Sequence, residues 1–166
     1  AAVHVQILDL HIGIDPGAAG CIAAISDTGV RTLRFAKATD KEIYEFMSNL
    51  SLSDTCFCTK EKVWAMPAKN PDGTERGMGA MTSFTFGENN GFIRGILVAT
   101  MIPYEEKVPQ TWQKLFGMKK EKNESQPEYK RRLKQKAEEL FPDMKITADM
   151  ADALLIAEFT KRTHNV

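Results

Sequence analysis

Two carboxylates lie on the apolar side of a predicted helix near the C-terminus. The segment from Thr147 to Phe159 has helical spacing, and Thr147 can serve as its N-cap. In this register Asp149 and Asp152 share a side with the apolar residues Ile156 and Phe159. Burying a carboxylate without a partner costs several kcal/mol, and a cation shared with other carboxylates would offset that cost. The fold must therefore bring further carboxylates to this helix.

Two more carboxylates follow strand-like segments. Residues 3–14 have the pattern of a strand that ends at Asp15, directly before a Pro-Gly turn. Residues 55–63 have the pattern of another strand, with Glu61 near its end. If these strands are parallel neighbours, both carboxylates leave the sheet at the same edge. Oxygen ligands without His or Cys favour Mg²⁺ or Mn²⁺. The sequence thus predicts a site for two Mg²⁺ or Mn²⁺ ions, formed by Asp15, Glu61, Asp149 and Asp152.

The remaining patterns predict an α/β fold with a five-stranded mixed sheet flanked by helices. Strands at residues 3–14, 21–26 and 30–35 are expected to form a meander, and strands at residues 55–63 and 102–108 to run parallel. Helices are expected over residues 41–50, 79–101, 109–116, 127–140 and from Thr147 onward, with Asp40 capping the first and a loop over residues 64–73. A length of 166 residues, 43% of them hydrophobic, suits a single domain over residues 1–166.

Composition excludes several classes of protein. The sequence has no apolar run of about 18 residues and no secretory leader, so a soluble, cytoplasmic protein is expected. Cys21, Cys56 and Cys58 are odd in number and lie in apolar runs, which favours reduced thiols over disulfides or a zinc site. The 22 basic residues balance the 22 acidic ones, so nucleic-acid binding would depend on local basic patches.

Four segments of this sequence resemble the RuvC-type Holliday junction resolvases, particularly their compact bacteriophage and bacterial relatives. These segments are residues 12–17, 61–67, 108–112 and 149–157, and the resemblance extends in order from about residue 10 to residue 160. It implies an RNase H-like fold, a homodimer, and two-metal cleavage of four-way DNA junctions that leaves 5′-phosphate and 3′-hydroxyl ends. By position, it also assigns the catalytic tetrad to Asp15, Glu61, Asp149 and Asp152.

The resemblance also implies DNA-binding residues. Trp64 matches an aromatic residue that stacks on unpaired bases at the junction centre, and Lys69 and Asn70 follow it as in the family. The basic residues expected to face phosphates are Lys107, Lys114, Lys119 and Lys120. Lys60 departs from the family pattern, because related strands carry an apolar residue at this position.

Two helices carry further expectations. Within residues 127–140, the periodicity places Tyr129, Leu133, Ala137 and Leu140 inward, and Lys130, Arg131, Lys134 and Lys136 mostly outward. In the helix over residues 79–101, Gly87, Gly91 and Gly95 recur every fourth position. Because glycine costs a helix about 1 kcal/mol relative to alanine, this face is expected to lie against another backbone, either the sheet or a second copy of the chain.

Other functions fit parts of the sequence. The same carboxylates would serve a nuclease that accepts flaps and forks as well as four-way junctions. The sequence of residues 12–17 also resembles the first phosphate loop of actin-like and sugar-kinase-like ATP-binding proteins. A DNA-structure binder without activity is a third possibility, and the four carboxylates argue against it.

Overall fold

The computed structural model describes residues 9–64, 68–69, 72, 74–77 and 79–164. Its centre is a five-stranded sheet in the order β3-β2-β1-β4-β7. The strands are β1 (Asp9–Asp15), β2 (Cys21–Ser26), β3 (Gly29–Arg34), β4 (Thr55–Glu61) and β7 (Tyr104–Lys107). The first three pair antiparallel, β4 runs parallel to β1, and β7 runs parallel to β4. This topology confirms the predicted meander with two parallel strands.

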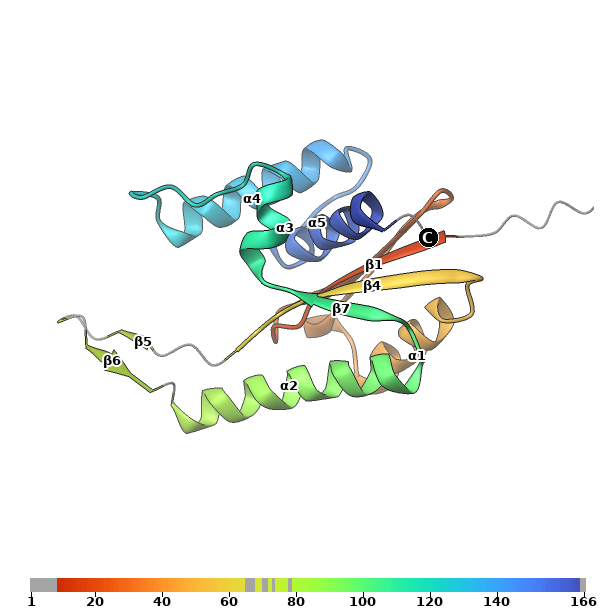
Figure 1. The fold of residues 1–166 in the computed structure, drawn as a ribbon, viewed down its shortest axis with the longest axis horizontal. Coiled ribbons are helices and arrows are strands. Elements are labelled where there is room, and N and C mark those ends of the chain that lie inside the picture. Colours follow the sequence, from red (N-terminus) through yellow and green to blue (C-terminus); the bar gives the residue numbers. More distant parts are fainter. Residues whose placement is uncertain (1–8, 65–67, 70–71, 73, 78, 165–166) are drawn as a thin grey trace, which may run out of the picture.

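Helices cover both faces of the sheet (Figure 1). On one face lie α1 (Asp40–Leu50) and α2 (Ala80–Ala99), and on the other lie α3 (Pro109–Leu115), α4 (Gln126–Leu140) and α5 (Ala148–Thr163). Each face has its own hydrophobic core. A 3₁₀ turn (Phe35–Lys37) precedes α1. None of the described helices is both long and apolar enough to cross a membrane.

Two of the expected boundaries were wrong. The cap of α1 is Thr39 and not Asp40, because the Thr39 hydroxyl accepts the backbone N–H of Glu42 at 3.3 Å and the Glu42 carboxylate accepts the backbone N–H of Thr39 at 2.7 Å. The segment expected to be a loop after Trp64 contains a short strand, β5 (Ala68–Lys69), which pairs antiparallel with β6 (Glu75–Arg76).

The helix α5 lies directly on β1 because Gly13 has no side chain. A Cβ atom at Gly13 would lie 2.2 Å from the backbone nitrogen of Ala157 and 2.3 Å from the carbonyl oxygen of Ala153. The Thr160 hydroxyl also donates to the carbonyl of Ile12 at 3.1 Å. The contact between the backbones of Gly13 and α5 sets the distance of α5 from the sheet, and so sets where the side chains of α5 begin.

Lys60 is a buried charge next to the last residue of β4. Its side chain is fully buried, and its Nζ donates to Glu106 Oε1 on β7 at 2.7 Å and to the carbonyl oxygen of Glu61 at 3.2 Å. Lys60 and Glu106 are direct cross-strand partners in the parallel register of β4 and β7. The strand can therefore carry lysine at a position where an apolar residue was expected, because Glu106 supplies the opposite charge.

The two members of this pair should respond differently to substitution. Glu106→Ala leaves the buried ammonium of Lys60 without its partner, and we expect a loss of about 3 kcal/mol in the free energy of unfolding. Lys60→Met removes the buried charge and leaves Glu106, whose side chain is 32% exposed and reaches water, so a change within about 1 kcal/mol is expected. Urea denaturation measures both, and equal losses would contradict this account.

Candidate active site

Three carboxylates converge where β1 and β4 end. Asp15 is the last residue of β1, Glu61 is the last residue of β4, and the parallel register that pairs Ile14 with Lys60 makes them neighbours. The side chain of Ile14 lies in the core under α1 and α2, so the next residue along the strand faces α5. Asp152, which is 5% exposed, comes from the N-terminal part of α5. The structure thus brings Asp15, Glu61 and Asp152 together.

The pKa values show that these carboxylates interact. Burial, followed by the negative charges of Asp15 and Asp152, raises the pKa of Glu61 to about 7. Burial also raises the pKa of Asp15, with the charge of Asp152 as the second cause. Raised values of this kind arise where like charges share a desolvated site, and they mark candidate functional groups.

Neighbouring groups hold two of these carboxylates in place. The backbone N–H of Gly17 donates to Asp15 Oδ1 at 3.1 Å, within the turn that follows β1. This turn requires Gly20, because a Cβ atom there would lie 2.0 Å from the carbonyl oxygen of Asp15. On α3, the indole Nε1–H of the buried Trp112 donates to Glu61 Oε2 at 3.0 Å. Trp112 belongs to a segment that the resemblance singled out, but no role for it was predicted.

The third carboxylate is paired with Lys130. The Lys130 ammonium on α4 donates to Asp152 Oδ2, and its side chain remains 48% exposed. Burial lowers the pKa of Lys130, but the charge of Asp152 and its hydrogen bond, with Asp15 and Glu61, outweigh burial and raise the pKa overall. Lys130 is therefore exposed, as predicted, although its ammonium reaches the buried Asp152. Tyr129, Leu133 and Ala137 are buried as predicted.

Asp149 is occupied by other partners. Arg34 at the end of β3 donates from Nε to Asp149 Oδ2 at 2.5 Å, and the Thr147 hydroxyl donates to Asp149 Oδ1. Burial acts to raise the pKa of Asp149, but these two hydrogen bonds outweigh it and hold the pKa below its usual range. Thr147 does occupy the N-cap position, although its side chain bonds to Asp149 and caps no backbone N–H. The metal-ligand and catalytic roles of Asp149 remain predictions.

The donors at this edge fit a hard divalent cation in their chemistry. All are carboxylate oxygens, and Asp152 Oδ1 is buried without a hydrogen-bond partner among the described residues. No three His, Cys, Asp or Glu side chains in the described part of the chain are arranged to hold one metal ion. In this structure Asp152 Oδ2 is bound to Lys130, and Asp149 is bound to Arg34. The Mg²⁺ or Mn²⁺ site stays a prediction that the donor set favours.

The predicted DNA-binding residues lie on several elements. Trp64, three residues after Glu61, is 44% exposed. Lys69 is in β5, and Asn70 lies outside the described residues. Lys107, at the end of β7, forms an ion pair with Glu105 at 2.7 Å. These DNA contacts all remain predictions.

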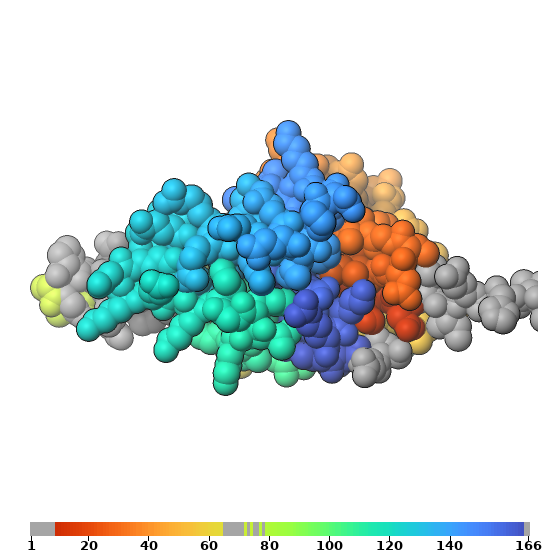
Figure 2. Space-filling model, turned by 90° about the horizontal axis from the view of Figure 1, so that it is seen from above, coloured from red at the N-terminus to blue at the C-terminus, as the bar shows by residue number. Residues whose placement is uncertain are grey.

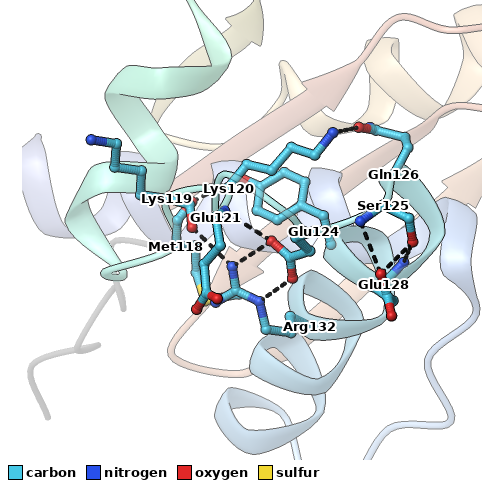
Figure 3. A network of polar contacts seen from close by, with 10 residues as sticks. Met118, Lys119, Lys120, Glu121, Glu124, Ser125, Gln126, Glu128 and Arg132 are labelled. Carbon is cyan, nitrogen blue, oxygen red and sulfur yellow. Dashed lines mark hydrogen bonds and ion pairs between the residues drawn. The ribbon is translucent and has the colours of Figure 1, made fainter.

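The other three predicted lysines lie together. A cavity of about 620 Å³ is lined by Lys114, Lys119 and Lys120, with Met118 and Tyr129 among its apolar walls. Figure 3 shows Lys119 extending away from the polar contacts of the segment before α4, whereas Lys120 donates to Gln126 at 3.2 Å. All three lysines belong to the stretch from α3 to the segment before α4, which forms part of the face shown in Figure 2.

Comparison with known proteins finds similarity in structure. No protein-family model matches the sequence, and no curated protein matches it. The structure is similar to RuvC in complex with a Holliday junction substrate, with a TM-score of 0.49 and 12% identity over 93% of this chain and 95% of that chain. A second RuvC structure has the same TM-score and identity over 95% of this chain and 97% of that chain. Both proteins come from Thermus thermophilus.

Proposed function

We propose that this protein is a divalent-metal-dependent endonuclease that cleaves four-way DNA junctions. The observation that carries the proposal is the convergence of Asp15, Glu61 and Asp152 from three separate elements, with a buried oxygen on Asp152 that has no partner in the described part of the chain. Like-charged groups are kept in a desolvated site at a cost in stability, which is typical of sites retained for function.

The residues of the chain would hold and orient the reacting groups. Bound at these carboxylates, Mg²⁺ or Mn²⁺ would lower the pKa of a water molecule and neutralise the charge that develops on the phosphate. Gly17 and Trp112 fix one oxygen each of Asp15 and Glu61, so these carboxylates need little reorganisation when a ligand binds. Hydrolysis would leave a 5′-phosphate and a 3′-hydroxyl, as the sequence resemblance implies.

Contacts with DNA would come from one aromatic residue and three lysines. Trp64 offers an exposed aromatic surface three residues after Glu61, suited to stacking on an unpaired base. Lys114, Lys119 and Lys120 would contact phosphates, so binding should weaken as the salt concentration rises.

A cleavage assay tests the proposed function. Synthetic four-way junctions, forks, flaps and linear duplexes of equal length, labelled on each strand in turn, are incubated with the protein and either Mg²⁺ or EDTA. We expect metal-dependent, symmetrically placed nicks in the junction that disappear in Asp15→Asn and Asp152→Asn. Equal cutting of forks or flaps would favour the broader branched-DNA nuclease. Absence of nicks, or nicks that persist in both variants, would contradict the proposal.

We also propose that the protein acts as a homodimer. Cβ atoms built at Gly87, Gly91 and Gly95 meet nothing within 4 Å among the described residues, which excludes the sheet as the partner of this helix face. Phe84 and Val98 on the same helix are each 68% exposed. A second copy would cover these side chains and use the close approach that glycine permits.

The mass in solution tests this second proposal. Light scattering at micromolar concentration should give a dimer, and Gly91→Leu should convert it to a monomer, because the added side chain would separate the two helices. A monomeric mass for the unmodified protein would contradict it.

A further inference from the structure

Lys130 is the cation that accompanies the carboxylate cluster. Its ammonium donates to Asp152 Oδ2 and interacts favourably with the charges of Asp15 and Glu61 as well. The other oxygen of Asp152 is buried. A lysine ammonium and a divalent cation both seek the same carboxylate oxygens, and their positive charges repel each other.

The fold fixes the helix from which Lys130 extends. Ser125 and Glu128 form a capping box at the start of α4, and Arg132 donates to Glu124 at 2.6 and 2.9 Å and to the carbonyl of Lys119 at 2.8 Å (Figure 3). The hydroxyl of the buried Tyr129 donates to the carbonyl of Met118 at 2.8 Å. These contacts tie the preceding segment to the first two turns of α4, so the backbone of Lys130 has a defined place beside α5.

The side chain of Lys130 is less constrained than its backbone. It is half-exposed, and four rotatable carbons separate the ammonium from the helix. The ammonium can therefore leave Asp152 for solvent without any movement of α4. By contrast, the carboxylate of Asp152 cannot reach water easily, since its side chain is only 7% exposed.

We propose that Lys130 is a built-in counter-ion of the cluster, which neutralises Asp152 in the metal-free protein and yields it when a divalent cation binds. The second half of this statement rests on the metal site of the proposed function. In this role Lys130 is a positioning residue that keeps three desolvated carboxylates together until metal arrives. It also lowers the apparent affinity for metal, because each binding event must first break the ion pair.

Two measurements on Lys130→Met test the proposal. In EDTA, the melting temperature should fall by roughly 4–8 °C, because the carboxylates lose their counter-ion. In saturating Mn²⁺ this difference should vanish, because metal then neutralises the cluster in both proteins. Isothermal titration calorimetry should show Mn²⁺ binding about tenfold more tightly to the variant. Lys130→Gln keeps a hydrogen-bond donor but not the charge, and it should behave like Lys130→Met. Agreement between the two variants shows that the effect does not come from misfolding of one of them.

The matched control is Lys134→Met, one turn further along α4, where the ammonium pairs with Glu138 at 2.7 Å away from the cluster. It should change neither the Mn²⁺ affinity nor the metal dependence of melting. If Lys130→Met lowers the melting temperature equally in EDTA and in Mn²⁺, and its affinity for Mn²⁺ is unchanged, Lys130 has a purely structural role and the proposal is overturned. If neither the natural protein nor Lys130→Met binds Mn²⁺, the metal site of the proposed function fails. The melting temperatures in EDTA would still decide whether Lys130 is the counter-ion.

Discussion

Replacing Glu61 by glutamine is expected to stabilise the metal-free protein at pH 8 and to reduce junction cleavage by at least about 10³-fold. Burial and two neighbouring negative charges raise the pKa of Glu61 to about 7 in the folded state, against an ordinary value of 4.5. The folded protein therefore binds more protons than the unfolded chain between these two pH values. The contribution of protonated Glu61 to the free energy of unfolding is therefore fully present below about pH 4.5 and is lost progressively as the pH rises through 7.

The size of the effect follows from this difference. Each unit of pKa difference between the folded and unfolded states corresponds to about 1.4 kcal/mol, so ionised Glu61 costs the folded protein about 3 kcal/mol at pH 8. Glutamine carries no charge, and its side-chain oxygen can still accept the hydrogen bond from Trp112. Glu61→Gln should therefore be more stable than the natural protein by up to about 3 kcal/mol at pH 8 and equally stable at pH 4.5.

Urea denaturation in EDTA at several pH values between 4.5 and 8 measures this difference, and the junction assay measures cleavage. Glu45→Gln is the matched control, because Glu45 on α1 is 53% exposed and forms a surface ion pair with Lys41 at 3.6 Å. It should change stability by less than about 0.5 kcal/mol and leave cleavage intact. If the natural protein is equally stable at pH 5 and pH 8, or if Glu61→Gln still cuts junctions, the assignment of Glu61 to the site is wrong.

Sequence patterns located the candidate site because its backbone geometry is regular. Parallel strands bring their carboxyl ends to one edge, so Asp15 and Glu61 could be placed together from strand patterns alone. Helical spacing put Asp152 on the buried side of α5, where the structure has it. Strand ends and helix sides follow from the regular geometry of the backbone, so a local sequence pattern is enough to predict them.

Long-range side-chain pairs could not be predicted in the same way. Helical spacing treats Asp149 and Asp152 alike, yet their partners differ. Arg34, which is 115 residues away from Asp149 along the chain, pairs with Asp149, whereas Lys130 pairs with Asp152. Lys130 follows the buried Tyr129, and periodicity placed it outward because it records where a Cβ atom points and not where a long lysine side chain reaches. The pairing of Lys60 with Glu106 depends on the register between β4 and β7, which no local pattern encodes.

The same contact that seats α5 on the sheet should make Gly13 intolerant of substitution. In Gly13→Ala the new Cβ would lie 2.2 Å from the Ala157 nitrogen and 2.3 Å from the Ala153 oxygen, both backbone atoms that cannot rotate away. The helix must move outward, so we expect a loss of about 4 kcal/mol or more out of the roughly 5–15 kcal/mol typical of a domain.

Cleavage should fall in Gly13→Ala even under conditions where the variant is folded, because Asp152 directly precedes Ala153 and moves with α5, whereas Asp15 and Glu61 stay on their strands. Thermal melting and the junction assay below the melting temperature measure the two effects. Gly77→Ala is the control, since a Cβ atom there meets nothing within 4 Å among the described residues and should change stability by less than about 0.5 kcal/mol. A Gly13→Ala protein that is as stable and as active as the natural one would show that α5 does not rest on β1 in this way, and the position of Asp152 relative to the two strand-end carboxylates would have to be revised.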